Sequence, residues 1–327
     1  MDQSGFRFIN TVALERDDPE IGLERWRHGP LAIRGRYDLG PMSSAGSGLL
    51  LLVDLDGVVY RGADPVPGVA AVLTDRVKRG DDVVYVTNNS MWYRAEYVAR
   101  LSDMGAPVDP DRIVSSPRAT ALYLREYLPE VRRVLAVGAG GLERELRDAG
   151  FEVVTAAHAA TLVGRDGVEA WDAAGAPDAV VVGLDPQLTY LRLAVAADCI
   201  RAGARFIATN RDPIYPTERG LRPGAGSIVA AVEATTGVTP VSIGKPAPYL
   251  LEEAAHTAGR EPAEAVMIGD GIDTDIAAAR AVGARSILML TGVTTRAQVD
   301  ALPADQRPTA VAVDAAELAA VLETLAG

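Results

Sequence analysis

The chain has 327 residues, of which 48% are hydrophobic, so it is long enough for two domains and can bury a sizeable core. Its formal net charge of -12 argues against nucleic acid and anionic membranes as partners, because both require clustered Lys and Arg. An anionic substrate would therefore need a locally positive pocket. The single cysteine, Cys199, excludes an intramolecular disulfide and a cysteine metal cluster, and a cytoplasmic location fits this composition.

Residues 1–48 differ from the rest of the chain. They are charged and rich in Arg, and they contain no apolar run long enough for a signal peptide or a membrane span. We interpret them as an N-terminal extension, either a disordered arm or the product of an upstream start site, and expect the fold to begin at residue 49.

The first expected element is a strand over residues 49–53. Its five consecutive apolar residues are too few for a helix and do not alternate, which favours a strand buried on both faces of a parallel sheet. Asp54 then lies at the carboxyl end of the strand, where open α/β sheets bind ligands, and Asp56 follows two residues later. If the chain is extended here, the two carboxylates project to one side, so that one can act as a nucleophile while the other donates and accepts protons. An Asx-type turn after a strand would also account for this pair.

A helix over residues 69–79 and a strand over residues 83–86 come next. The strand ends at Thr87, Asn88, Asn89 and Ser90. The Thr87 hydroxyl and the backbone N–H of Asn88 suit a phosphate oxygen at the same sheet edge as Asp54. Alternatively, these polar residues close a turn and cap the next helix.

Helices and strands alternate from residue 94 onward, which predicts a second α/β unit. We expect helices over 94–104, 117–127, 141–149 and 190–202, and strands over 133–137, 151–154, 179–182 and 205–208. Helices over 227–236, 246–258 and 274–282, strands over 266–268 and 286–290, and a last strand and helix within 310–325 then complete the first sheet. The expected fold class is α/β.

Lys245 stands directly before Pro246, which is expected to mark the first turn of a helix. The helix macrodipole disfavours a cation there by about 0.3–1 kcal/mol. This cost is understandable if the ammonium neutralises a carboxylate and a phosphate in the crevice, although a solvated surface lysine is the alternative.

Another strand end carries Asp270, between Gly269 and Gly271. Together with Asp54 it offers the hard oxygen ligands that Mg²⁺ prefers. Asp273, in the first turn of the helix that follows, is explained by the helix dipole alone.

In this order and at strand ends, these stretches resemble the four motifs of the haloacid dehalogenase-like hydrolase superfamily. The motifs are Asp54-Leu55-Asp56-Gly57, Thr87-Asn88, Lys245, and Gly269-Asp270 with Asp275 five positions after Asp270. The gap of about 155 residues between the second and third motifs resembles the large α/β cap of the branch that contains nitrophenylphosphatase-like, phosphoglycolate, glycerol-phosphate and nucleotide phosphatases.

The resemblance implies a Rossmann-like parallel-sheet core from residues 49–92 and 216–327, with an α/β cap inserted over residues 93–215. Trp92 and Tyr93 would lie at the hinge between them, where other members carry smaller and more polar residues. Because related capped phosphatases are often homodimers, a homodimer is an assembly to expect.

The resemblance also implies a phosphoric monoester hydrolase that uses Mg²⁺ and acts on small phosphorylated metabolites, such as glycerol phosphate, phosphoglycolate, sugar phosphates or nucleotides. Asp54 would form an aspartyl-phosphate, and Asp56 would protonate the leaving alkoxide and then activate water. An acid at position 56 points to a phosphatase or a phosphomutase, and the cap position favours a phosphatase.

Further roles follow from the same resemblance. Thr87, Asn88, Asn89 and Lys245 would hold the phosphoryl oxygens. Asp54, the Asp56 carbonyl and Asp270 would hold Mg²⁺, and Asp275 would orient the water shell of the metal. The resemblance also puts a loop over residues 211–215 near the mouth of the site, where Tyr215 would either contact the leaving group or pack the boundary between cap and core.

Two other functions compete with this interpretation. A nucleotide-dependent oxidoreductase is suggested by Gly138, Gly140 and Gly141 after a strand, but Glu143 stands where a dinucleotide fingerprint needs its third glycine. A non-catalytic or nucleotide-binding α/β protein is disfavoured, because every expected catalytic position is filled.

Overall fold

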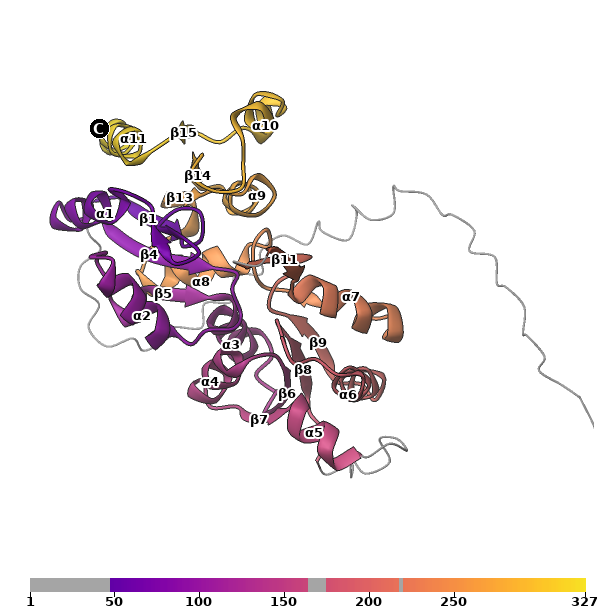
Figure 1. The fold of residues 1–327 in the computed structure, drawn as a ribbon. Coiled ribbons are helices and arrows are strands. Elements are labelled where there is room, and N and C mark those ends of the chain that lie inside the picture. Colours follow the sequence, from indigo (N-terminus) through magenta and orange to yellow (C-terminus); the bar gives the residue numbers. More distant parts are fainter. Residues whose placement is uncertain (1–47, 164–174, 218–219) are drawn as a thin grey trace, which may run out of the picture. The chain divides into compact units, whose positions relative to one another are not determined.

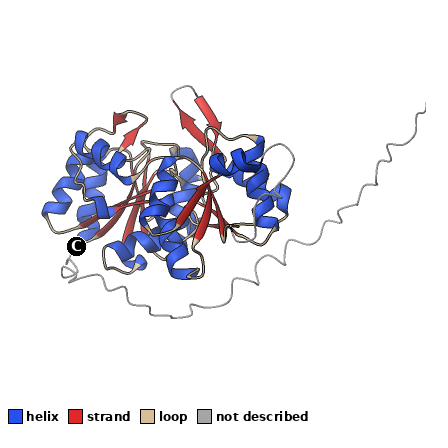
Figure 2. Cartoon of the chain, turned by 90° about the horizontal axis from the view of Figure 1, so that it is seen from below, coloured by secondary structure: helices blue, strands red, loops and turns tan. Residues whose placement is uncertain are grey.

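Two parallel β-sheets with helices on their faces form the part of the chain that the computed structural model describes, residues 48–163, 175–217 and 220–327 (Figures 1 and 2). This confirms the α/β class. The expected N-terminal extension over residues 1–48 lies outside the described residues except for Gly48.

The first sheet has six parallel strands. In spatial order they are β15 (Ala310–Ala312), β14 (Arg285–Met289), β13 (Ala265–Gly269), β1 (Leu50–Asp54), β4 (Asp82–Thr87) and β5 (Ile113–Ser115). Its helices are α1 (Val69–Lys78), α2 (Arg94–Asp103), α8 (Tyr249–Thr257), α9 (Ala277–Ala281), α10 (Arg296–Asp300) and α11 (Ala315–Ala326).

The strand β1 is buried on both faces, as its apolar run predicts. Leu50 and Leu52 pack into the buried cluster that includes α8 and α9, whereas Leu51 and Val53 pack into the cluster that includes α1, α2 and α11. This alternation follows from the two-residue period of a strand. Each fully buried leucine contributes about 1.5–3 kcal/mol of transfer free energy, so the apolar run fixes β1 in the middle of the sheet.

The second sheet has five parallel strands. In spatial order they are β12 (Val241–Ser242), β9 (Arg205–Ala208), β8 (Ala179–Val182), β6 (Arg133–Val137) and β7 (Glu152–Thr155). The helices that accompany it are α3 (Ser116–Tyr127), α4 (Gly140–Asp148), α5 (Ala156–Val163), α6 (Tyr190–Arg201) and α7 (Ala225–Thr236).

The strand pairing divides the described residues differently from the expected boundaries at 93 and 216. The strand β5 pairs with β4 in the first sheet, and β12 pairs with β9 in the second. The helix α2 also belongs with the first sheet, because its Tyr97 and Leu101 pack there. By strand pairing, the inserted α/β part therefore begins after β5 and ends after β12. The boundaries of independently folding domains stay a prediction, since the described residues from 48 onward belong to one compact unit.

Two antiparallel hairpins supplement the sheets, and the sequence analysis missed both. One joins β2 (Tyr60–Arg61) to β3 (Asp64–Pro65), and the other joins β10 (Ile214–Thr217) to β11 (Gly220–Pro223). The short α5 was also missed.

No helix within the described residues is long and apolar enough to cross a membrane. A cytoplasmic location stays a prediction.

Candidate active site

A cavity of about 1450 Å³ lies beyond the carboxyl ends of β1, β4 and β13. The strand register creates this position, because Val53 pairs with Tyr85 on one side and with Ile268 on the other, so the residues that follow meet at one edge. Every candidate site residue from the sequence lines the cavity: Asp54, Asp56, Thr87, Asn88, Asn89, Tyr215, Lys245, Asp270 and Asp275.

Asp54 and Asp56 face the cavity from the end of β1, whereas Leu55 between them is fully buried. Burial raises the pKa of Asp54 well above its ordinary value, the Lys245 ammonium opposes this shift, and the nearby carboxylates add to it. Asp56 is open to the cavity, and its partial burial raises the pKa of its carboxyl as well. The turn after it depends on Gly57, whose φ of 81° suits glycine.

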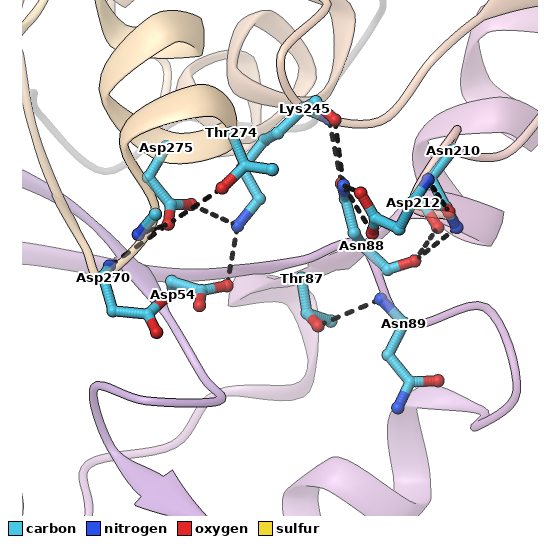
Figure 3. A network of polar contacts seen from close by, with 12 residues as sticks. Asp54, Thr87, Asn88, Asn89, Asn210, Asp212, Lys245, Asp270, Thr274 and Asp275 are labelled. Carbon is cyan, nitrogen blue, oxygen red and sulfur yellow. Dashed lines mark hydrogen bonds and ion pairs between the residues drawn. The ribbon is translucent and has the colours of Figure 1, made fainter. Parts of the chain in front are cut away.

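Lys245 is a buried cation between two acids (Figure 3). Its Nζ donates to Asp54 Oδ1 and to Asp275 Oδ1, at 2.6 Å each. Burial alone would lower the pKa of Lys245, but the two carboxylates together raise it above its ordinary value. The ammonium therefore stays charged, and the alternative of a solvated surface lysine is wrong.

The expectation that Pro246 marks a first helical turn is also wrong. The helix α8 begins at Tyr249, so Lys245 lies in the preceding loop. Side-chain contacts hold it there, and the unfavourable helix dipole that we expected does not act on a residue outside the helix.

Asn88 holds the backbone of that loop. Its Oδ1 accepts from Lys245 N at 2.8 Å, and its Nδ2 donates to Lys245 O at 2.9 Å and to Asp212 Oδ2 at 3.1 Å (Figure 3). Burial raises the pKa of Asp212, and the Asn88 amide opposes this shift. The side chain of Asn88 is thus fully engaged, so any direct contact with a phosphoryl oxygen falls to its backbone N–H.

Asp270 and Asp275 are locked by backbone donors. Asp275 Oδ2 accepts from Gly271 N at 2.9 Å and from Asp270 N at 3.2 Å. Asp270 Oδ2 accepts from Val293 N at 2.8 Å. Burial and the neighbouring Asp275 raise the pKa of Asp270 to about 6.

The loop after β14 is a part of the site that the sequence analysis missed. Thr291 Oγ1 donates to Gly57 O at 2.6 Å, and Thr294 Oγ1 donates to Asp270 O at 2.5 Å. A Cβ at Gly292 would stand 1.8 Å from Asp270 Oδ2, so only glycine fits there. The sequence did offer a signal for this loop. It is a polar run with a glycine that follows a predicted strand, so it stands at the carboxyl end of a strand like the other motifs.

The acidic cluster fits a divalent metal ion. Asp54, Asp270 and Asp275 each offer a carboxylate oxygen, and these atoms lie within 4.8 Å of one another. Lys245 contacts two of these acids, Asp54 and Asp275, so three ionised carboxylates and one ammonium would leave an excess of buried negative charge. Carboxylate oxygens are hard ligands and suit Mg²⁺.

The leaving-group side of the cavity is lined by Tyr215 and Trp92. Tyr215, on β10, is half-buried and hydrogen-bonds with the Asn89 side chain. Tyr93 does not line the cavity: its hydroxyl donates to Asp148 Oδ2 on α4 at 2.6 Å. Of the two bulky residues after the second motif, only Trp92 is therefore placed for substrate contact.

The glycine turn that suggested a dinucleotide site has another use. Gly141 N donates to Met91 O at 3.0 Å, and a Cβ on Gly141 would lie 2.4 Å from the Trp92 carbonyl carbon. The first turn of α4 is thus packed against the segment after β4, where a pyrophosphate would have to lie.

Two family models match the chain. Residues 51–152 match the model described as haloacid dehalogenase-like hydrolase, and residues 242–318 match a model described as HAD-hydrolase-like. An acid sugar phosphatase of Staphylococcus epidermidis is 36% identical over 244 residues, which cover 75% of this chain and 87% of that protein.

Solved structures agree with this match. A p-nitrophenyl phosphatase from Archaeoglobus fulgidus is 30% identical with a TM-score of 0.73, covering 84% of this chain and 99% of that one. A glycerol phosphate phosphatase from Mycobacterium tuberculosis, solved in complex with magnesium, is 36% identical with a TM-score of 0.71, covering 85% of this chain and 78% of that one. The family models, the relative and the similar structures thus indicate the same family as the four motifs. The chain belongs to the haloacid dehalogenase-like hydrolases and is a phosphatase with a cap.

Proposed function

We propose that the protein is a Mg²⁺-dependent phosphatase that hydrolyses phosphate monoesters of small metabolites through an aspartyl-phosphate on Asp54. The observation that carries this proposal is the buried cluster of Asp54, Asp270, Asp275 and Lys245 beside the open Asp56. It combines a nucleophile, a fixed cation, oxygen ligands and an accessible acid in one cavity.

In the first step, an Asp54 carboxylate oxygen attacks phosphorus, and the bond from phosphorus to the leaving oxygen breaks. Asp56 gives its proton to that oxygen, and its raised pKa favours the protonated form that this step needs. The leaving group departs as an alcohol.

In the second step, Asp56, now ionised, takes a proton from water as the water attacks phosphorus. The bond between phosphorus and Asp54 breaks, which releases inorganic phosphate and returns both acids to their starting states.

Lys245 contributes positive charge beside the reacting atoms. Its two carboxylate contacts hold the ammonium within 2.6 Å of the nucleophile, where it can neutralise charge on the transferring phosphoryl group. The Thr87 hydroxyl and the backbone N–H of Asn88 complete the expected phosphoryl contacts from the neighbouring strand β4. Asn89, beside them, meets Tyr215 and bounds the site toward the cap.

Asp54, the Asp56 carbonyl and Asp270 would hold Mg²⁺, which supplies charge neutralisation at the phosphoryl oxygens when bound. Asp275 positions Lys245 and the Asp270 loop through its two oxygens.

The names of the relatives support a substrate class of small phosphate monoesters, including sugar phosphates, glycerol phosphate and p-nitrophenyl phosphate. The test measures phosphate release from these compounds and from phosphoglycolate and nucleotides, with Mg²⁺ and after chelation. Release that requires Mg²⁺ supports the proposal, whereas full activity in excess chelator contradicts the metal dependence.

The covalent step has its own test. With p-nitrophenyl phosphate, whose leaving group departs without a proton, Asp56→Asn should slow the second step more than the first, so that phosphorylated protein accumulates and is detected by mass after acid quenching. If the quenched variant never carries phosphate while it still turns over, the covalent route is wrong.

A further inference from the structure

The cavity is more basic on its leaving-group side than the chain as a whole. Arg61, Arg100 and Arg222 all line it, although the net charge of the protein is -12. Among the described lining residues outside the metal and phosphoryl site, the acids are Asp103 and Asp212, and the Asn88 amide already bonds Asp212. On this side of the cavity three guanidinium groups stand against two carboxylates, so an anionic group of a substrate would meet a small excess of positive charge.

The Arg100 guanidinium packs against two aromatic rings. Its guanidinium carbon lies 3.6 Å from the centroid of the Tyr60 ring and 5.1 Å from that of Trp92. Stacking engages the faces of the guanidinium and leaves the N–H groups at its edge available. Within the part of the chain that the structure describes, Arg100 forms no ion pair, whereas Arg94 on the same helix binds Glu145.

The position of Arg100 places it next to the reacting end of the cavity. Tyr60, on which it stacks, forms an isolated backbone bridge with Asp56, the proposed proton donor to the leaving oxygen. Burial raises the pKa of Asp56 and the charge of Arg100 opposes this shift, so the guanidinium lies near the proposed proton donor. We therefore expect a substituent on the first carbons of the leaving group to lie near Arg100. Tyr215 and Arg222, paired across the hairpin of β10 and β11, line the same cavity.

We propose that Arg100 is a specificity-determining residue that binds a second anionic group, a carboxylate or another phosphate, on the leaving group of the substrate. The inference rests on the proposed phosphatase function, since the leaving group is defined by the position of Asp56. The planar fork of an arginine matches either anion in a bidentate contact. Arg61 and Arg222, both exposed, extend the positive potential but lack the aromatic support.

The test compares substrates that differ in one group. Phosphoglycolate carries a carboxylate where 2-hydroxyethyl phosphate carries a hydroxymethyl group, and ethane-1,2-diyl bisphosphate carries a second phosphate on the oxygen of that hydroxymethyl group. We expect wild-type kcat/KM to favour at least one of the anionic compounds over the neutral one by about 10-fold or more. Whichever anionic compound loses more in the Arg100→Leu variant identifies the source of the anion.

The Arg100→Leu variant should lose about 10- to 100-fold in kcat/KM on the preferred anionic substrate and less than about 3-fold on 2-hydroxyethyl phosphate. The ratio is decisive, because any influence of Arg100 through Asp56 affects all three substrates alike. Arg100→Lys should fall between wild type and Arg100→Leu, since it keeps the charge and loses the fork.

Arg144→Leu is the matched control. Arg144 also lies over a tyrosine, with its guanidinium carbon 5.7 Å from the Tyr93 centroid, but it does not line the cavity, so the substrate ratio should stay at the wild-type value. Activity on the neutral substrate verifies that each variant is folded, and Arg100→Gln replaces the leucine variant if that activity is lost.

An equal loss on all three substrates, or a wild-type enzyme that does not discriminate, would overturn the role of Arg100 and leave the phosphatase proposal intact. If the protein hydrolyses none of the three compounds and does not hydrolyse p-nitrophenyl phosphate either, the proposed function itself is overturned.

Discussion

Replacing Asn88 by alanine tests whether this residue supports catalysis indirectly, by holding the backbone of the loop that carries Lys245. The Asn88 side chain holds both Lys245 N and Lys245 O, at 2.8 and 2.9 Å, across 157 positions of sequence. The Asn88→Ala variant leaves these two backbone groups without their partner beside a buried ammonium. We expect two losses that can be measured separately, one in stability and one in catalysis.

The stability loss follows from the two unpaired groups. Each buried polar group without a partner costs about 1–3 kcal/mol, and water from the cavity will offset part of this, so we expect a loss of about 2–4 kcal/mol. For a unit of this size the melting temperature should then fall by about 4–8 °C. Differential scanning fluorimetry and urea unfolding measure this change.

The catalytic loss follows from the position of Lys245. A displacement of its ammonium by about 1 Å would cost on the order of 100-fold in kcat, because the charge would no longer match the transferring phosphoryl group. Thr120→Val is the matched control: it removes one buried hydrogen bond, from Thr120 Oγ1 to Ser116 O, at a site outside the cavity. It should lower stability while kcat stays at the wild-type value.

The reasoning is refuted if Asn88→Ala keeps kcat/KM within about 3-fold of wild type, since the loop would then be fixed by other contacts. A variant that loses activity without losing stability would point to a direct phosphate contact of the side chain, against the hydrogen-bond pattern observed.

Further predictions concern the acids. Asp54→Asn should reduce phosphate release to less than a few per cent of wild type with the fold intact, because an amide is a poor nucleophile; substantial residual turnover in purified variant would exclude the covalent route. Asp270→Ala should raise the Mg²⁺ concentration needed for half-maximal activity, measured by titrating metal at fixed substrate, and an unchanged metal requirement would remove Asp270 from the ligands. Burial raises the pKa of Glu253 to about 8 from 4.5, so the folded protein keeps a proton that the unfolded chain releases. Its contribution to stability is therefore full below pH 4.5 and is lost as the pH rises through about 8. Urea unfolding at several pH values measures this decline in the free energy of unfolding, and Glu253→Gln should remove it. Parallel curves of free energy against pH for the two proteins would contradict the prediction.

The sequence was sufficient where one local pattern determined the outcome. Leu50 to Val53 could only be a buried strand, and the position of Asp54 at its end followed from the geometry of a parallel sheet. The same argument placed Asp270 at the end of β13. The first, second and fourth motifs then converge at one edge because the register of three neighbouring strands aligns their ends, whereas Lys245 reaches that edge from a loop.

What the sequence did not predict depends on contacts between distant segments. The side chain of Asn88 bonds to Lys245, which no local pattern reveals. The stacking of Arg100 on Tyr60 joins α2 to the turn after β1, and helix periodicity alone gave no reason to place Arg100 in the site. The helix start at Tyr249 was misjudged because Pro246 is a favourable first-turn residue, and the local preference lost to the loop contacts of Lys245.

The strand at the edge of the first sheet could not be predicted either. The strand β5 has only three residues, Ile113–Ser115, and its assignment to the first sheet depends on pairing with Thr87 and its neighbours. Such a short run carries no periodicity from which a sheet could be inferred.

The buried cluster that includes Leu50 and Leu52 of the first sheet continues through α8 and α3 to Val134 and Val181 of the second. We therefore expect the two sheets to unfold together as one cooperative unit, although the chain enters and leaves the second sheet by separate segments. Opening either sheet would expose the apolar flank of the other, so local unfolding should be confined to the hairpins and not to a whole sheet. Hydrogen exchange should accordingly be fast in β10 and β11 and uniformly slow in β1, β6 and β8.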